Sequence, residues 1–272
     1  MKKSGTYSVE GFSVGRQIIA EACSQAKYYN HIVGLSEMDV TKATDIIEKH
    51  KEKTGERLSF TSWVMKCVAQ AVTEYKVVQS FRVKRKKKLI VFDDVDIKAN
   101  VEKDDIDGKK IPVVYTIRKA NEKSFEEIQE EIRMAQKYDE DKREKEAKIK
   151  RQHRTLMRLP VWFREFFIWR SIMRDPFKIK KNFGTIGVTA MGMFGKGLYG
   201  WAIPKTMHST TVALGAIIKR PIVDENDEIV IKKILPVTTE FNHDIVDGGP
   251  AVRFVARLYE LMDQAYGLEN YM

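Results

Sequence analysis

The chain has 272 residues, of which 43% are hydrophobic and 32% are charged. That composition is typical of a globular protein with a buried core, and it excludes a disordered tail. No apolar run approaches the roughly 18 to 20 residues of a membrane-spanning helix, and the first residues contain no apolar leader, so we expect neither secretion nor membrane spanning. The two cysteines, Cys23 and Cys67, cannot build a disulfide framework or a cysteine zinc site. We therefore expect a reduced, cytoplasmic setting.

The positive charge is concentrated in one segment. The chain has 48 Lys and Arg against 38 Asp and Glu, a net charge of +10. Residues 148–181 alone contain eleven basic and two acidic residues, a net charge of +9. The rest is nearly neutral, so we predict no nucleic-acid partner. The other basic run, at 84–88, lies between two strand-like runs without interleaved aromatic residues, which indicates a solvated hairpin tip.

Helices and strands alternate along the first half of the chain. Ser13 and Ser59 are suited to cap two helices, and Ser124 with Glu127 has the spacing of a capping box. In chain order we predict a helix after Ser13, a loosely alternating run at 29–38, helices at 41–53 and after Ser59, strands at 81–83, 89–92, 96–101 and 111–117, and a helix at 124–136.

The second half begins with a charged run at 138–150 and the basic segment. Strands rich in β-branched residues follow at 184–189, 210–219 and 229–240, and a last helix begins at Pro250. That helix is predicted to bury Val252, Phe254, Val255, Leu258, Leu261 and Met262. Strands and helices interleave without a strict repeat or a Pro-rich linker. We therefore predict a single α/β (α+β) domain with a mixed sheet flanked by helices.

One histidine has a distinctive local sequence. Of the five histidines, no pair has the spacing of a metal site, and the phosphate-binding and serine-hydrolase motifs are absent, so we expect no bound metal. His243 lies in a short turn that ends in Gly248 and Gly249, between the last strand and the last helix. The backbone of such a turn would hold the imidazole in place, as a general base requires. A surface histidine beside a capping aspartate is the alternative that these residues leave open.

The same turn resembles a family signature. His243, Asp247 and Gly248 are similar to the His-x-x-x-Asp-Gly motif of the catalytic domains of dihydrolipoamide (2-oxoacid dehydrogenase) acyltransferases and of chloramphenicol acetyltransferases. Further segments resemble the family in order: Arg16 with its helix, His31, 38–41, 58–60, 111–114, 123–128 and 183–195. The resemblance implies a chloramphenicol-acetyltransferase-like fold, one catalytic domain over 1–272 that forms trimers, and an insertion at about 138–181.

The resemblance also implies an activity and roles for four residues. The chain would be a CoA-dependent acyltransferase with CoA or acyl-CoA as substrate, in which His243 removes the proton of an attacking thiol or hydroxyl. Thr189 would stabilise the oxyanion, and Asp247 would pair with Arg16 to fix the histidine turn. The residues alone also allow Thr189 to be a strand threonine that hydrogen-bonds across the sheet. An imidazole base contributes roughly 10² to 10⁴ to the rate, which suits this chemistry.

Some features depart from the dehydrogenase-complex pattern. Asn242 stands where the family usually has Asp, and Asp244 where it has Arg. We also see no lipoyl-bearing domain, so we expect no lipoyl group on this chain and a stand-alone acyltransferase. It would act on a small or protein-bound thiol or hydroxyl acceptor, as a homotrimer or in a larger assembly. The alternative is a catalytically silent trimeric scaffold or partner-binding relative.

The basic segment needs its own explanation. On a helical wheel one broad face collects large apolar residues, namely Leu156, Leu159, Trp162, Phe163, Phe166, Phe167, Trp169 and Met173. One interpretation is a helical arm clamped between subunits or over the mouth of the active site. The other is peripheral contact of 156–174 with an anionic membrane surface. Because the arginines are interspersed along the helix, packing within the assembly is the favoured interpretation.

Overall fold

The structure is a computed structural model that describes residues 5–83, 87–104, 110–136, 151–192 and 199–271. Three sequence predictions therefore fall partly outside the described residues. They concern the basic hairpin tip (84–86), the charged run (137–150) and the end of the glycine-rich segment (193–198).

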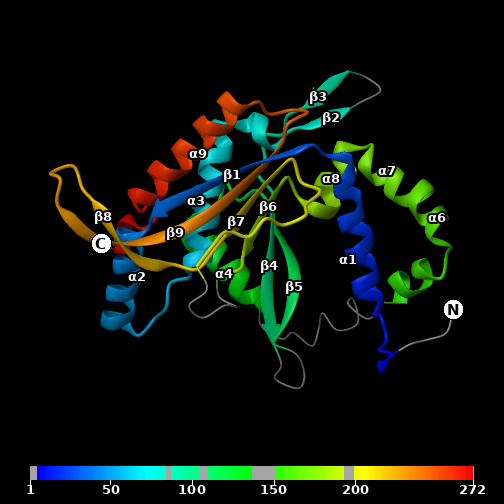
Figure 1. Ribbon diagram of the computed structural model, residues 1–272, viewed down its shortest axis with the longest axis horizontal. Coiled ribbons are helices and arrows are strands. Elements are labelled where there is room, and N and C mark those ends of the chain that lie inside the picture. The colour runs from blue at the N-terminus through cyan, green and yellow to red at the C-terminus, as the bar shows by residue number, and fades with distance from the viewer. Residues whose placement is uncertain (1–4, 84–86, 105–109, 137–150, 193–198, 272) are drawn as a thin grey trace.

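A mixed seven-stranded sheet forms the centre of the described chain (Figure 1). Its strand order is β1-β9-β7-β6-β4-β5, and β8 pairs with the free part of β9. The pairs β4–β6 and β6–β7 are parallel, whereas the others are antiparallel. The strands are β1 (His31–Asp39), β4 (Ile97–Asp104), β5 (Lys110–Ile117), β6 (Ile186–Ala190), β7 (Thr210–Leu214), β8 (Ile218–Val223) and β9 (Ile229–Asn242). The predicted mixed sheet flanked by helices is confirmed.

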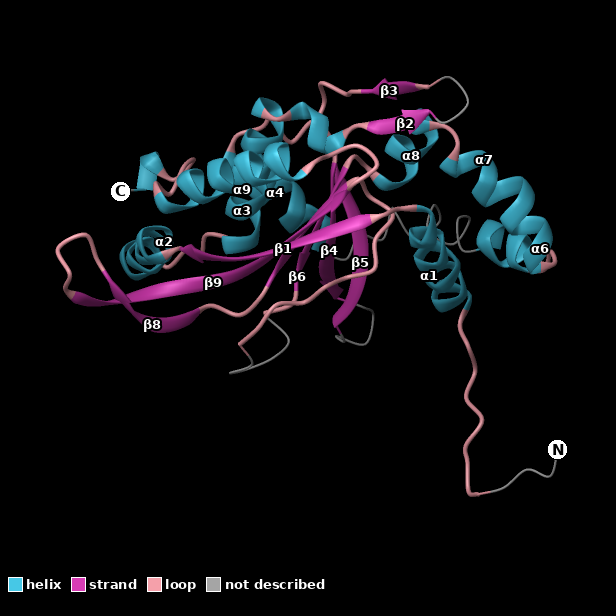
Figure 2. Cartoon of the chain, turned by 45° about the horizontal axis from the view of Figure 1, so that its top comes forward, coloured by secondary structure: helices cyan, strands magenta, loops and turns pink. Residues whose placement is uncertain are grey.

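One face of the sheet is covered by a layer of helices. Figure 2 shows α3, α4 and α9 together on one side of the sheet, with α2 beside them. Side chains alternate along a strand, so every second residue faces this layer. Trp63 of α3 and Phe254 of α9 are completely buried there. The helices are α2 (Thr41–Thr54), α3 (Phe60–Glu74), α4 (Phe125–Gln136) and α9 (Gly248–Asp263).

Helix α1 (Val14–Ser24) and the arm formed by the basic segment lie at one end of the molecule (Figure 1). The two lie beside each other, and a small hairpin joins β2 (Phe81–Val83) to β3 (Lys88–Ile90) (Figure 1). The arm consists of a helical stretch at 151–157, α6 (Val161–Phe163), the π-helical η5 (Arg164–Trp169), α7 (Arg170–Met173) and α8 (Pro176–Phe183). Short 3₁₀ turns are η1 (Gln25–Tyr28), η2 (Lys76–Gln79) and η6 (Glu269–Tyr271).

The predicted helix starts are confirmed by their hydrogen bonds. The hydroxyls of Ser13 and Ser59 accept from backbone N–H groups three residues later, at 3.3 and 3.2 Å. Ser124 and Glu127 form the reciprocal pair of a capping box: the Ser124 N–H donates to Glu127 Oε2 at 2.7 Å, and the Glu127 N–H donates to Ser124 Oγ at 3.2 Å. Local sequence therefore determines where these helices begin.

Three predicted details of the second half are wrong. The strand expected at 210–219 is divided into β7 and β8, because residues 215–217 lie opposite only two residues of β9, between the pairs Leu214–Val237 and Ile218–Ile234. Val252, expected in the core, is 68% exposed on the outer face of α9. The arm is not one continuous helix, because Pro160 interrupts it and a π-helical turn follows.

Candidate active site

Backbone hydrogen bonds hold the histidine turn at both ends. Where β9 ends, the N–H of Asn242 donates to the Ser209 carbonyl and the N–H of His243 donates to the Asn30 carbonyl, both at 2.7 Å. The N–H groups of Ile245 and Val246 then donate to the Asn242 carbonyl at 3.0 Å. The side chain of Val246 is completely buried. His243 is therefore positioned by a rigid turn, as the sequence predicts.

The imidazole of His243 projects from this turn. Its side chain is 49% exposed, and Nδ1 lies 3.7 Å from Oδ1 of Asp247, beyond hydrogen-bond distance. Asp247 occupies the N-cap position of α9, but its side chain makes no capping hydrogen bond and is 84% exposed. Both side chains can therefore reach a molecule that approaches the turn from outside.

The two departures from the family pattern contact each other. Oδ1 of Asn242 accepts from the N–H of Asp244 at 3.2 Å. The carboxylate of Asp244 accepts from Asn30 at 2.9 Å and pairs with Arg82 of β2 at 3.3 Å. Sequence reasoning missed Arg82, although a carboxylate in place of the usual arginine signals that a cation should lie nearby. The turn thus contains a carboxylate–guanidinium pair between Asp244 and Arg82.

The predicted pair between Arg16 and Asp247 is not formed within the chain. Arg16 is exposed on the first turn of α1, and neither residue has the other as a partner. The physical reason is that α1 packs beside the arm, whereas Asp247 begins α9 at the end of the turn. The structure therefore does not bring Arg16 into the site of its own subunit.

Thr189 lies on the sheet face opposite the helix layer, at some distance from the turn. Its neighbour Val188 belongs to the helix-covered core. Thr189 of β6 pairs with Ala213 of β7, which in turn pairs with Thr238 of β9. Asn242, at the end of β9, is four residues beyond Thr238. With about 4.8 Å between strands and about 3.4 Å per residue, Thr189 lies about 17 Å from Asn242, where the turn begins. One subunit therefore does not unite these two predicted catalytic groups.

The face that carries Thr189 buries polar side chains without partners. Glu240 is 2% exposed and Thr238 is 1% exposed, and Glu240 Oε2 and Thr238 Oγ1 have no hydrogen-bond partner among the described residues. Burial raises the pKa of Glu240 to about 7. Buried polar atoms are nearly always paired in folded proteins. Their presence here marks this face as different from a structural core.

A buried histidine supports the beginning of β6 from the same face. The Thr211 hydroxyl donates to Thr206 Oγ1 at 2.9 Å, and the Thr206 hydroxyl lies 2.9 Å from Nδ1 of His208. Nε2 of His208 donates to the Phe183 carbonyl at 2.9 Å. Burial, with the charge of Lys98 nearby, lowers the pKa of His208 to about 4, so the ring is neutral. Sequence reasoning did not single out His208, because its partners lie in separate segments.

Lys98 of β4 faces the same region. Burial lowers its pKa to about 8, and its Nζ lies 4.3 Å from the centre of the Phe183 ring. It was not predicted either, since a single lysine within a strand carries no motif. Among the described residues, no cluster of three His, Cys, Asp or Glu could hold a metal ion, and no helix is long and apolar enough to cross a membrane.

Comparison with known proteins places this arrangement in a family. Residues 4–156 and 181–268 match the family described as 2-oxoacid dehydrogenases acyltransferase (catalytic domain). In sequence, the lipoamide acyltransferase component of the branched-chain alpha-keto acid dehydrogenase complex of Pseudomonas putida is 29% identical over 80 residues. That match spans 29% of this chain and 18% of the Pseudomonas protein.

Solved structures share the fold. The dihydrolipoamide acetyltransferase of Azotobacter vinelandii superposes with a TM-score of 0.67 at 20% identity, over 96% of this chain and 93% of that chain. A serine, a histidine and an asparagine of that protein have been investigated for their roles in its catalytic mechanism. A truncated catalytic core of the 2-oxoacid dehydrogenase multienzyme complex of Thermoplasma acidophilum gives a TM-score of 0.61 at 18% identity, over 96% and 100% of the two chains. Because the family match covers far more than half of its residues, the chain belongs to the 2-oxoacid dehydrogenase acyltransferase family through the catalytic domain.

Proposed function

We propose that the protein transfers an acyl group between CoA and a thiol or hydroxyl acceptor, with His243 as the general base. The observation that carries this proposal is the half-exposed imidazole of His243 on a turn fixed by backbone hydrogen bonds. General bases need such fixed placement together with access to the substrate proton. The histidine and the asparagine studied in the Azotobacter enzyme are four positions apart, as are His243 and Asp247.

The reaction follows from the properties of the imidazole. His243 takes the proton of the acceptor thiol or hydroxyl, whose sulfur or oxygen attacks the carbonyl carbon of the acyl-CoA thioester. A tetrahedral intermediate forms, its carbon–sulfur bond to CoA breaks, and the thiolate of CoA takes the proton from the imidazolium. Asp247 is the carboxylate nearest the ring, and we assign it the role of orienting the ring and balancing the imidazolium charge.

The oxyanion of the intermediate needs a donor, and we assign the Thr189 hydroxyl to it. Since Thr189 lies about 17 Å from the start of the histidine turn of the same subunit by strand geometry, Thr189 and His243 can act together only when they come from different subunits. A closed homotrimer provides such sites, because each subunit presents its histidine turn to one neighbour and its threonine face to the other. We therefore include the trimer in the proposal.

Acyl transfer itself is the first test. The full chain would be incubated with several acyl-CoAs and with dihydrolipoamide or simple alcohols, and CoA release would be followed by chromatography. We expect transfer by the parent protein and a decrease in kcat of roughly 10² to 10⁴ for His243→Ala, with the fold and assembly unchanged. His153→Ala, which replaces an exposed histidine of the arm, is the matched control and should keep the parent rate.

Two results would contradict the assignment. A His243→Ala variant that retains more than a tenth of the parent kcat would exclude His243 as the base. Silence of the well-folded parent with every substrate pair would favour the alternative, a catalytically silent trimeric scaffold, which the unusual Asn242 and Asp244 keep open.

The shared site has a separate test. Thr189→Ala should lower kcat by roughly 10 to 10³. Mixed trimers, assembled from Thr189→Ala and His243→Ala chains, should regain activity because some interfaces then combine an intact threonine with an intact histidine. A monomer in light scattering that transfers acyl groups at the full rate would exclude the shared site.

A further inference from the structure

The arm is attached to α1 through one buried ion pair. Arg164 is 5% exposed. Its Nε–H donates to both carboxylate oxygens of Glu21, at 3.0 Å to Oε1 and 3.2 Å to Oε2. The indole N–H of Trp169 donates to Oε2 of Glu21 at 3.0 Å. Burial raises the pKa of Glu21, but the hydrogen bonds from Arg164 and Trp169 outweigh it and lower that pKa overall. One side of the arm is therefore fixed to its own subunit.

The π-helical turn explains which side is fixed. Arg164 and Trp169 are five residues apart, and the i→i+5 pattern of η5 brings such residues onto one side of the helix. An α-helix would have separated them around its circumference. The opposite side then exposes four large apolar residues, which we call the aromatic face: Val161 (55% exposed), Trp162 (66%), Phe166 (55%) and Phe167 (54%). The sequence-based helical wheel is corrected here, since it grouped Trp169 with Trp162 and Phe166.

The aromatic face is compact and accessible. The Phe166 and Phe167 rings lie 5.0 Å apart, and the guanidinium of Arg170 lies 5.0 Å from the centre of the Phe166 ring. Figures 1 and 2 both place α6 and α7 at the outer edge of the subunit, far from the hairpin of β8 and β9. A flat surface could therefore approach the aromatic face of one subunit.

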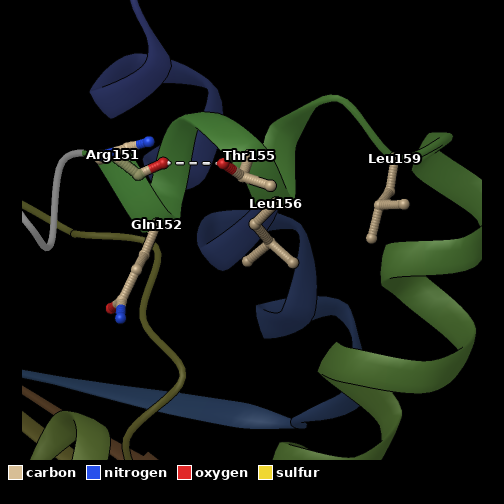
Figure 3. A pocket seen from close by; sticks show the side chains of 5 residues that line it. All are labelled: Arg151, Gln152, Thr155, Leu156 and Leu159. Carbon is tan, nitrogen blue, oxygen red and sulfur yellow. Dashed lines mark hydrogen bonds between the residues drawn. The ribbon is translucent and has the colours of Figure 1, made fainter.

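Several basic side chains of the arm are exposed, and Arg170 lies over a ring of the aromatic face. Arg154, Arg158 and Arg170 are exposed, as are Arg174 and Lys178 towards α8. Figure 3 shows a pocket beside the helical stretch at 151–157, before α6 begins. It is lined by Arg151, Gln152, Thr155, Leu156 and Leu159. The arm thus combines an apolar centre with a positive rim.

We propose that the aromatic face docks on an anionic lipid membrane surface. Trp and Phe side chains partition into the boundary between headgroups and acyl chains, while arginines keep their charge at the level of the lipid phosphates. The exposed Arg154, Arg158 and Arg170 of the arm complement the negative surface of such a membrane, whereas Arg164 is neutralised by Glu21. An interfacial helix needs no spanning length, and no helix of the described chain has it. This proposal concerns location and is independent of the proposed acyl transfer.

Vesicle sedimentation tests it directly. The full chain would be mixed with phosphatidylcholine vesicles that do or do not contain about one third phosphatidylserine, at roughly 0.1 and 0.5 M salt. We expect binding to the anionic vesicles that weakens in high salt, and little binding to the neutral ones. Simultaneous Trp162→Ser, Phe166→Ser and Phe167→Ser should lower the partition coefficient at least tenfold. The matched control replaces Val223, Ile229 and Ile231, which are equally exposed near the β8–β9 hairpin, by serine and should bind like the parent.

A second variant keeps the test valid if the triple variant fails to fold. Arg158→Gln with Arg170→Gln retains the aromatic face and should lower both the binding and its salt dependence. The proposal is overturned if the parent does not bind anionic vesicles, or if both variants bind like the parent. If the parent does not bind vesicles and the triple variant also fails to form a trimer, the aromatic face is a subunit contact instead.

Discussion

The two faces of the central sheet bury different kinds of side chain. Under α3, α4 and α9 the buried side chains are mainly apolar, and Phe254 packs edge-on against Phe241 with ring centres 5.7 Å apart. On the other face, Glu240, Thr238 and His208 are buried although they are polar. Apolar burial stabilises a fold, whereas burial of an unpaired carboxylate costs free energy. The first face therefore holds the subunit together, and the second keeps polar groups in place next to Thr189.

The largest effect on stability is expected from the helix-covered face. Phe254→Ala should lower the free energy of unfolding by about 3 to 5 kcal/mol, because it removes a fully buried aromatic ring and leaves a cavity. Urea unfolding at one fixed protein concentration measures it. Val252→Ala, on the exposed side of the same helix, is the control and should change stability by less than about 0.5 kcal/mol. Equal losses in both variants would contradict the assignment of the two sides of α9.

The buried carboxyl of Glu240 on the polar face should make the free energy of unfolding depend on pH. Burial raises the pKa of Glu240 from 4.5 to about 7 in the folded state. The folded state therefore binds this proton more tightly than the unfolded state. The stabilisation that this proton gives the folded state is complete below pH 4.5 and is lost as the pH rises through 7. The loss amounts to about 3 kcal/mol, since one pKa unit corresponds to about 1.4 kcal/mol.

Glu240→Gln should remove this dependence. The variant should be more stable than the parent at pH 8 by up to about 3 kcal/mol, and the difference should shrink as the pH falls towards 4.5. Denaturant unfolding at a series of pH values measures the difference, and Glu225→Gln, at an exposed position, is the control. His208 destabilises both proteins as the pH falls from 6.5 through 4, so only their difference reports on Glu240. A difference that is constant over this range would show that Glu240 has a partner in the assembled protein.

The smallest effect is expected from Arg16→Ala. Because Arg16 is exposed and does not pair with Asp247 within the chain, its replacement should change the free energy of unfolding by less than about 0.5 kcal/mol. Thermal unfolding at several protein concentrations gives the measurement. A destabilisation of more than 1 kcal/mol that depends on concentration would instead indicate a contact of Arg16 across a subunit interface.

The predictable features are those that short sequence segments determine. Helix caps at Ser13 and Ser59 depend on residues three positions away, and the turn around His243 directly follows the end of a predicted strand. The family signature also lies within that turn, so the candidate base could be identified without a structure.

Features that depend on distant residues could not be predicted. Asp244 is paired with Arg82, which lies 162 positions earlier, and no local pattern links them. Arg164 and Trp169 of the π-helical turn both bind Glu21, which lies 143 positions before Arg164. A helical wheel assumes one regular period, so it assigned Trp169 to the same face as residues that the structure exposes.

The position of β1 in the sheet has a consequence for the order of folding. β1 pairs with β9 alone, and His31 lies opposite Asn242. Helix α1 contains no buried residue, and its anchors Arg164 and Trp169 also come much later in the chain. During synthesis β1 therefore cannot begin to pair before Ile234 has left the ribosome, and it cannot pair along its whole length before Asn242 has left it. Contacts so distant in sequence make folding slow, and the nascent chain exposes the unpaired edge of β1 until β9 is available.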